Sequence, residues 1–386
     1  MDEYQDVDEH QYELLRLLSP PDGNLCAIGD PDQAIYSFRG ADVKYFLRFN
    51  EDFTDARLVR LTRNYRSSAP ILAAAVQAIA PSTLVSGRRL DPARLDPEAA
   101  LVGRYFATSV ADEADFVVRT VDELVGGLSH RSLDSGRVDS RAVAPGTLSF
   151  SDIAVLYRAD SQSGPIVEAL SRAGVPVQKR SHNRLRDRAG VQVIARELRH
   201  AGGLGGSLAA RVKLTAQVLA QRYAAPTLDA EQLAPDDIWT AADLLMPLAH
   251  RIGDDLPTFL LQIETGAEVD ALDPRAEAVH LLTLHAAKGL EFPVVFLVGC
   301  EDGLLPLRWP GGSAEADVSE ERRLFFVGLT RAQDRLYVTH SSRRFRHGSD
   351  RDQAPSPFLD AIDAGLFERL GDRVPARPKD RQLRLL

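Results

Sequence analysis

The feature that most constrains the fold is a recurring unit in which a short apolar run stops at a polar loop and an amphipathic helix follows. Such runs are typical of buried parallel strands, and the helices between them are typical of crossover connections. The predicted strands lie at 101–108, 153–157, 175–177, 279–284, 294–298 and 336–339. The predicted helices between them lie at 109–124, 165–173 and 318–329. The sequence therefore predicts an α/β protein with parallel sheets.

Composition agrees with an ordinary globular protein. The 386 residues are enough for two or three domains, and 44% of them are hydrophobic while 26% are charged. The formal net charge of -9 excludes a generally basic surface. Any binding of nucleic acid must therefore come from a local groove rather than from the charge of the whole protein.

Cysteine content and hydropathy indicate the compartment. Cys26 and Cys300 lie in apolar, strand-like runs and are predicted to be small core residues in a reducing environment. The sequence contains no signal peptide and no apolar run long enough to cross a bilayer. These features predict a cytoplasmic protein with no membrane partner.

The strand and helix patterns also divide the chain. Residues 1–80 are predicted to end a first α/β domain, with buried strands at 25–28 and 56–61, and residues 81–100 to be a polar connector. A second α/β domain is predicted from 101–180 and 279–345. The remaining parts are a helical insertion at 181–278 and a tail at 346–386. The insertion is predicted to contain helices at Val191–His200, Leu208–Tyr223, Pro235–Arg251 and Leu256–Thr265.

The loop Gly29–Ala41 carries an unusual combination of side chains. Gln33 can sense a phosphate through its amide, while Tyr36, Phe38 and Arg39 can stack on bases and hold a nucleic-acid backbone. The alternative is a polar turn with core aromatic residues. The loop by itself does not decide between these interpretations.

Three further polar segments lie at the ends of predicted strands. Asp2 and Glu3 suit a magnesium ligand and a water-activating base, although by themselves they are better explained as the start of an acidic helix. Tyr65 and Arg66 could cover a flat ring and contact a phosphate, or could be a packed tyrosine and a surface arginine. The third segment starts at His285. Since parallel sheets gather such loops at their carboxyl edges, the segments are expected around one site.

Five motifs, in this order, resemble motifs two to six of the UvrD/Rep-type DNA helicases of superfamily 1. They are Asp2–Asp6, Gly29–Ala41, Asn64–Ser67, Thr283–Phe292 and Glu320–Ala332. The resemblance extends from residue 1 to about residue 341 and is weakest in the helical insertion. It implies one incomplete RecA-like motor domain and one complete RecA-like domain that carries the insertion.

The resemblance also implies roles for individual residues, with ATP and Mg²⁺ as cofactors. Asp2 is implied as the magnesium ligand, Glu3 as the residue that activates water, and Gln33 as the γ-phosphate sensor. Arg66 and Arg331 would neutralise charge that develops during phosphoryl transfer. The remaining nucleotide contacts implied are Tyr65 on adenine, Glu291 on ribose, and Gly289. The implied contacts with single-stranded DNA are Tyr36, Phe38, Arg39, Asn64, Thr283 and His285.

The sequence departs from the family pattern in one respect that concerns activity. It contains no Gly-x-x-x-x-Gly-Lys-Ser/Thr loop, and it begins inside motif two. We therefore expect the C-terminal portion of a 3′–5′ helicase of DNA repair or recombination that is deficient in ATP hydrolysis by itself. A separate N-terminal helicase fragment or repair proteins are the expected partners. The alternative is a non-enzymatic remnant that binds single-stranded DNA or a partner protein.

Overall fold

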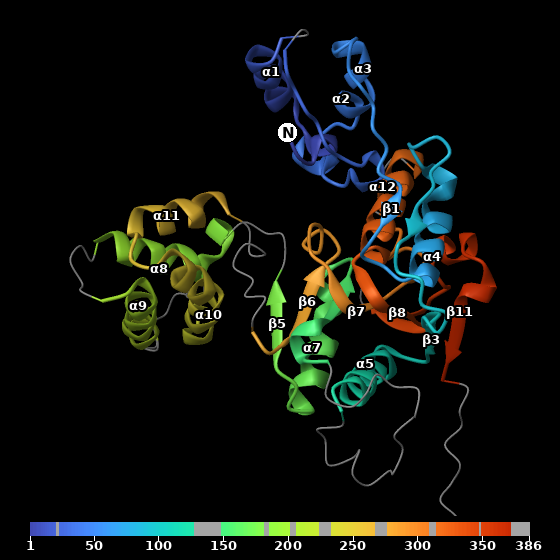
Figure 1. The fold of residues 1–386 in the computed structure, drawn as a ribbon. Helices are drawn as coiled ribbons and strands as arrows, with labels where there is room; N and C mark the ends of the chain where they lie inside the picture. The colour runs from blue at the N-terminus through green and yellow to red at the C-terminus, as the bar shows by residue number, and fades with distance from the viewer. Residues whose placement is uncertain are drawn as a thin grey trace, which may run out of the picture.

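The structure is a computed structural model, and Figure 1 shows its fold. The residues that it describes are 1–20, 23–126, 148–180, 185–200, 206–223, 233–266, 276–308, 314–346 and 349–371.

A seven-stranded sheet is the centre of the molecule (Figure 1). Its strand order is β11-β3-β8-β7-β4-β6-β5, and every pairing between neighbours is parallel. The strands are β3 (Val102–Ala107), β4 (Ile153–Tyr157), β5 (Val177–Arg180), β6 (Val279–Thr283), β7 (Phe292–Leu297), β8 (Ala332–Ser341) and β11 (Phe367–Leu370). The prediction of a parallel α/β fold is confirmed. The predicted strand at 175–177 instead begins at Val177, and β11 lies in a tail for which no strand was predicted.

Side chains alternate between the two faces of this sheet, as the period of a strand requires. On β4, Val155 packs into one hydrophobic cluster with α5 (Val110–Leu124) and α7 (Ser163–Arg172). Leu156 packs into the other cluster with α4 (Ala69–Ile79) and α12 (Ala314–Leu329). Helices therefore cover both faces, which explains why the strands are continuous apolar runs rather than alternating ones.

Helix ends follow local chemistry. Ser109 is the N-cap of α5, and its Oγ accepts a hydrogen bond from the backbone N of Asp112 at 3.2 Å. At the other end of the next helix, Gly174 adopts a φ of 74°, a left-handed conformation that favours glycine after a helix.

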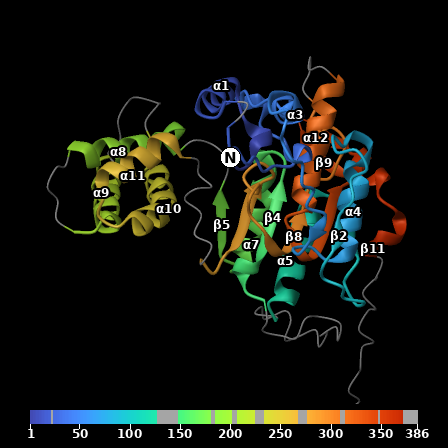
Figure 2. The same ribbon diagram turned by 45° about the horizontal axis from the view of Figure 1, so that its top comes forward.

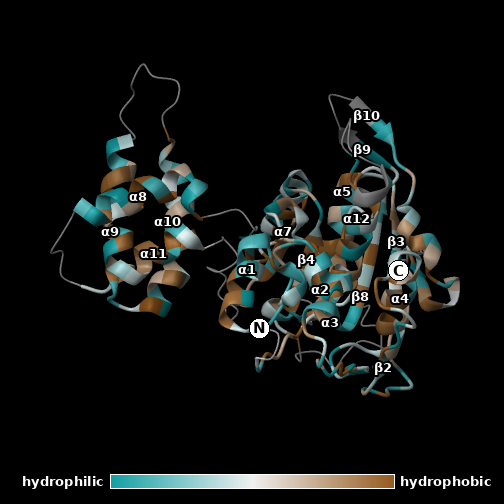
Figure 3. Ribbon diagram, turned by 90° about the horizontal axis from the view of Figure 1, so that it is seen from above, coloured by the Kyte–Doolittle hydropathy of each residue, from teal (hydrophilic) through white to brown (hydrophobic). Residues whose placement is uncertain are grey.

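Four helices form a separate hydrophobic core. They are α8 (Ala189–His200), α9 (Leu208–Tyr223), α10 (Pro235–Ile252) and α11 (Leu256–Thr265). Figures 2 and 3 show them beside the sheet. Their buried residues, among them Leu198, Val212, Leu245 and Phe259, form a cluster distinct from those of the sheet. The four predicted helices are confirmed, with ends that move by two residues or fewer.

The N-terminal segment corrects the sequence analysis. Neither 25–28 nor 56–61 is a strand, and their apolar side chains are largely exposed, with Ile28 at 56% and Leu61 at 83%. A buried strand needs neighbouring strands on its edges, and no such ladder is assigned to either run among the described residues. For the same reason, Cys26 is exposed rather than part of a core, while Cys300 is buried as predicted.

The regular elements of this segment are short. They comprise α1 (Glu9–Leu18), α2 (Lys44–Leu47), α3 (Phe49–Asp52), β1 (Arg63–Asn64) and β2 (Asp91–Pro92). Several 3₁₀ turns accompany them, including Tyr4–Asp6, Pro31–Gln33 and Ser37–Arg39. The carboxyl ends of the central strands point towards this segment (Figures 1 and 2). Loops from both parts of the chain therefore meet at one edge of the sheet.

The C-terminal tail contains more structure than the sequence indicates. β9 (Arg343–Arg346) and β10 (Ser349–Asp352) form an antiparallel hairpin. A 3₁₀ helix follows at Pro357–Ala361.

Candidate functional site

Two arginines from distant parts of the sequence meet at Thr330. The Nη1 of Arg66 lies 3.3 Å from the backbone oxygen of Thr330, and its Nε donates to Glu291. The Nη2 of Arg331 donates to the Oγ1 of the same threonine at 3.0 Å. Arg66 follows β1 and Arg331 follows α12, so the sheet edge brings both cations together as the resemblance implies.

Arg331 is a buried cation whose acceptors are uncharged. It is 2% exposed, and besides Thr330 it donates to the backbone oxygens of Val327 at 2.9 Å and Leu290 at 3.1 Å. Burial, followed by the nearby charge of Arg66, lowers its pKa to about 10. Arg331 thus stays protonated at neutral pH at an energetic cost, which a bound anion would reduce.

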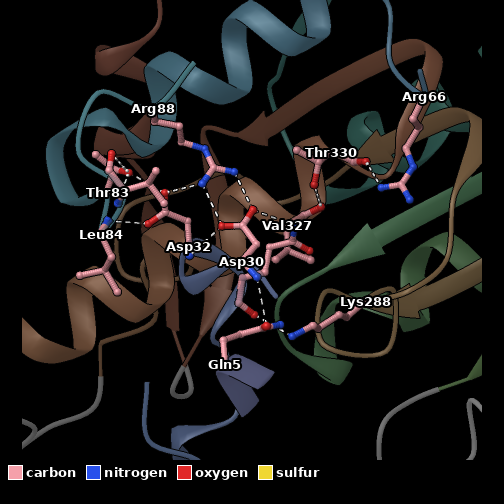
Figure 4. A network of polar contacts seen from close by, with 12 residues as sticks. Gln5, Asp30, Asp32, Arg66, Thr83, Leu84, Arg88, Lys288, Val327 and Thr330 are labelled. Carbon is pink, nitrogen blue, oxygen red and sulfur yellow. Dashed lines mark hydrogen bonds and ion pairs between the residues drawn. The ribbon is translucent and has the colours of Figure 1, made fainter. Parts of the chain in front are cut away.

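The proposed phosphate sensor, Gln33, contacts a network of charged side chains, of which Figure 4 shows Asp30, Asp32 and Arg88. The Nε2 of Gln33 donates to the Oδ2 of Asp30 at 3.0 Å. Arg88 binds Asp30 at 2.6 Å and Asp32 at 2.8 Å. Burial disfavours the charged form of Asp30, but hydrogen bonds and charge from Arg88 outweigh burial and lower its pKa. The direction of the Gln33 amide therefore depends on this group of charges.

Lys288 links the N-terminal acids to the sheet. Its Nζ donates to the carboxylate of Asp6 and, at 2.8 Å, to the backbone oxygen of Gln33, and lies 3.3 Å from Glu3. The side chain of Lys288 is 5% exposed. Burial raises the pKa of Asp6, which the Lys288 charge only partly offsets. Glu3 itself has a left-handed φ of 50°, which is uncommon for a residue with a side chain.

Aromatic residues form a platform next to Lys288. The rings of Phe38 and His285 meet edge to face at 5.2 Å between centroids, and the Tyr36 hydroxyl lies 3.2 Å from the backbone oxygen of His285. The guanidinium of Arg39 lies 5.9 Å from the ring centres of both Tyr36 and Phe38. Phe38 is 64% exposed, so its face is accessible for stacking on a base.

The other residues predicted to contact nucleotide or DNA are either exposed or hydrogen-bonded to nearby backbone. Tyr65 is 68% exposed, and Gly289 is exposed with a φ of 82°. The side-chain oxygen of Asn64 accepts from the backbone N of Ser67 at 2.9 Å, and that of Thr283 accepts from the backbone N of Ala286 at 3.2 Å. Both polar groups hold local turns here, and their DNA contacts stay predictions.

The magnesium ligand also stays a prediction. Asp2 is exposed, and its Oδ1 accepts from the backbone N of Glu3 at 2.9 Å. Within the described ranges, no group of three or more His, Cys, Asp or Glu side chains is arranged to hold a metal ion. Carboxylate and phosphate oxygens together would suit Mg²⁺, so Asp2 could contribute one ligand beside a nucleotide.

Several residues that organise this site were not predicted. Lys288 and Asp30 lie inside two of the five motifs, so the sequence already showed a charged side chain at each position. Arg88 lies in the polar connector among several other arginines. Its partners are more than fifty residues away, which no local pattern could have indicated.

Comparisons with known proteins show which families two parts of the chain resemble. Residues 1–54 match the UvrD/REP helicase N-terminal domain, and residues 250–343 match the UvrD-like helicase C-terminal domain. The chain is related to the UvrD/Rep-type helicases. This relationship agrees with the five motifs and with the meeting of Arg66 and Arg331.

Curated relatives of UvrD/Rep type align with almost the whole chain. The ATP-dependent DNA helicase PcrA of Staphylococcus aureus (strain MRSA252) is 27% identical, over 98% of this chain and 60% of the relative. The PcrA of Bacillus subtilis (strain 168) is 28% identical, over 98% of this chain and 59% of the relative. The chain thus spans about 60% of the length of the relatives that it matches.

One solved structure, the C-terminal domain of a possible DNA helicase from Lactobacillus plantarum WCFS1, is 14% identical. The aligned region covers 79% of this chain and 98% of the solved chain, with a TM-score of 0.34. Within the described part of the chain, no helix combines the length and hydropathy needed to cross a membrane.

Proposed function

We propose that this chain supplies the C-terminal portion of an ATP-dependent DNA helicase that moves 3′ to 5′ along single-stranded DNA. The observation that carries the proposal is the meeting of Arg66 and Arg331 at Thr330. Arg331 donates to uncharged oxygens, while Arg66 pairs with Glu291, and two such neighbouring guanidinium groups are suited to the charge of a transferring phosphoryl group. Asp30 contributes to the electrostatic environment of Arg331 and holds Gln33, so the sensor belongs to the same neighbourhood.

The site and its cofactors follow from this proposal. Glu3 would activate water, Asp2 would bind Mg²⁺, and Tyr65 with Glu291 and Gly289 would hold the nucleoside of ATP. The aromatic platform of Tyr36, Phe38 and His285 would stack on bases in any sequence, which suits a protein that moves along DNA. A role in repair or recombination and a cytoplasmic location belong to the same proposal.

Hydrolysis by the 386 residues themselves is expected to be deficient, because they contain no glycine-rich phosphate loop. The test is an ATPase assay of the purified chain with and without single-stranded DNA. Robust turnover that depends on Arg331 would contradict the expected deficiency. In a helicase reconstituted from this chain and an N-terminal helicase fragment, Arg331→Lys should lower kcat by a larger factor than it changes KM. The reason is that the guanidinium would act mainly in the transition state.

A second candidate is a module that binds a protein partner or single-stranded DNA without hydrolysis. The exposed apolar runs at 25–28 and 56–61 favour it, since exposed aliphatic segments of strand-like sequence are typical of surfaces that accept another chain. The partner would be an N-terminal helicase fragment or a repair protein. Titration of labelled single-stranded DNA with and without ATP distinguishes the candidates, because affinity that ignores nucleotide favours the binding module.

A further inference from the structure

Arg88 is the centre of a buried cluster of charges (Figure 4). Its Nη1 lies 2.8 Å from both Asp30 and Asp32, and its Nη2 lies 2.6 Å from Asp30. The side chains are 8% exposed for Arg88, 24% for Asp30 and 0% for Asp32. A single guanidinium therefore compensates two carboxylates in a setting where an unpaired carboxylate would be costly.

The carboxylates of Asp30 and Asp32 also accept hydrogen bonds from other groups. Asp32 accepts from the backbone N of Leu84 at 2.6 Å and from the hydroxyl of Thr83 at 2.5 Å, which fastens the connector around Arg88. Asp30 accepts from the Gln33 amide. Arg88 thus connects residues 83–88 with the N-cap, Asp30, and the middle residue, Asp32, of the turn that carries Gln33.

Helix α12 supports the same loop from the other side. The guanidinium of Arg88 lies 4.7 Å from the ring centre of Phe326, and the Nε of Arg323 donates to the backbone oxygen of Ala34 at 2.9 Å. Glu320 accepts from the hydroxyl and the backbone N of Ser37. The loop is therefore fixed between the connector and α12 before it reaches the exposed ring of Phe38.

We propose that Arg88 is a positioning residue for the loop Gly29–Ala41. It directs the Gln33 amide through Asp30 and sets the position of the aromatic platform at Tyr36 and Phe38, without itself contacting DNA. The inference rests on the proposed function, because it assumes that this platform binds single-stranded DNA. It adds a residue of the connector, outside the five motifs, to the machinery of the site.

The test is fluorescence-anisotropy titration of labelled oligothymidine with the 386-residue chain. Arg88→Met keeps an unbranched apolar stem and removes the guanidinium group with its charge, and we expect the affinity to fall about tenfold. The dependence of affinity on salt should not change, because no phosphate contact is lost. A direct contact would instead reduce the salt slope by about 0.7. Arg89→Met is the matched control, since Arg89 is 78% exposed and pairs with Asp91, and it should change affinity less than twofold.

A second variant guards against loss of folding. Arg88→Lys keeps a cation beside Asp30 and Asp32 but cannot bridge them with a planar fork, so an intermediate loss of affinity is expected, again without a change of salt slope. The positioning role would be overturned if both variants were folded and bound the oligonucleotide with wild-type affinity. It would also be overturned if either variant reduced the dependence of affinity on salt. Failure of the wild-type chain to bind the oligonucleotide would instead overturn the proposed DNA function, and this inference with it.

Discussion

At the scale of single residues, buried charges decide how the N-terminal segment contacts the sheet. Lys288 illustrates the point, because one ammonium group serves Asp6, Glu3 and the backbone of Gln33 while nearly excluded from water. Such groups are costly to leave without a partner. Their removal is therefore a sensitive probe of the contact.

Lys288→Met should lower the free energy of unfolding by about 1–3 kcal/mol, because Asp6 would be left buried without its cation. The loss should be larger at pH 7 than at pH 5, since protonation of Asp6, whose pKa burial already raises, relieves the unpaired charge. Urea unfolding at both pH values provides the measurement. Lys179→Met, at the exposed pair with Asp160, is the control and should cost less than about 1 kcal/mol.

Asp30 predicts a pH dependence of stability at a lower pH. Although burial opposes ionisation, Arg88 lowers the pKa of Asp30 below its ordinary value of 3.8 in the folded state. Its contribution to stability is therefore present above pH 3.8 and disappears as the pH falls through the lower, folded-state pKa. Asp30→Asn should destabilise the chain at pH 7, and the difference from wild type should shrink below pH 4. Urea unfolding between pH 7 and pH 3 measures this, and a constant difference would contradict it.

At the scale of elements, close packing fixes where the loop Gly29–Ala41 begins. A Cβ at Gly29 would collide with the side-chain oxygen of Gln5 and would lie 2.9 Å from the ring of Phe46. The turn at Pro31–Gln33 and the platform at Tyr36 follow directly after this point. The start of the loop therefore has little tolerance for added volume.

Gly29→Ala should lower stability by about 1–3 kcal/mol, the usual cost of overpacking. It should also weaken binding of single-stranded DNA, because the loop must shift. Gly164→Ala is the control, since a Cβ there meets open space in the first turn of α7 and should stabilise that helix by up to about 1 kcal/mol. Thermal unfolding of both variants measures the contrast, and equal effects would argue against the packing account.

At the scale of the whole molecule, the helices α8–α11 and the sheet have separate hydrophobic cores. Leu245 belongs to the first core and Leu297 to the second, and both are fully buried. If the two cores unfold as separate cooperative units, a cavity in one should leave the stability of the other unchanged.

Leu245→Ala and Leu297→Ala should therefore each lower the temperature of a different calorimetric transition. Each should reduce the free energy of unfolding of its own core by about 2–5 kcal/mol. Differential scanning calorimetry of the full chain provides the measurement. A single transition that both substitutions shift equally would show that the two cores unfold together.

The exposed aliphatic residues of the N-terminal segment predict the behaviour of the chain in solution. Leu17 and Leu61 are each 83% exposed, and apolar groups in such positions favour association. The chain should associate with increasing concentration, and Leu17→Lys with Leu61→Lys should move its mass, measured by light scattering, towards that of a monomer. Leu214→Lys, on the 48% exposed position in α9, is the control. Monomeric wild-type protein at all concentrations would contradict the prediction.

The sequence by itself determined the parallel α/β class, most strands and helices, and the order of the motifs. Continuous apolar runs at 153–157 and helical spacing at 208–223 are local signals, so β4 and α9 have the predicted bounds. The motifs also contain Arg66 and Arg331, which both contact Thr330 in the structure. These features depend on local periodicity and on residue identity, which the sequence contains.

Only the tertiary structure decided the partners of the buried charges and the solvent exposure of two apolar runs. Arg88 looks like any arginine of a polar connector until the fold places it beside Asp30, Asp32 and Phe326. The runs at 25–28 and 56–61 have the sequence of buried strands, yet they are exposed. Burial depends on which other segments lie alongside, and a local pattern carries no information about those neighbours.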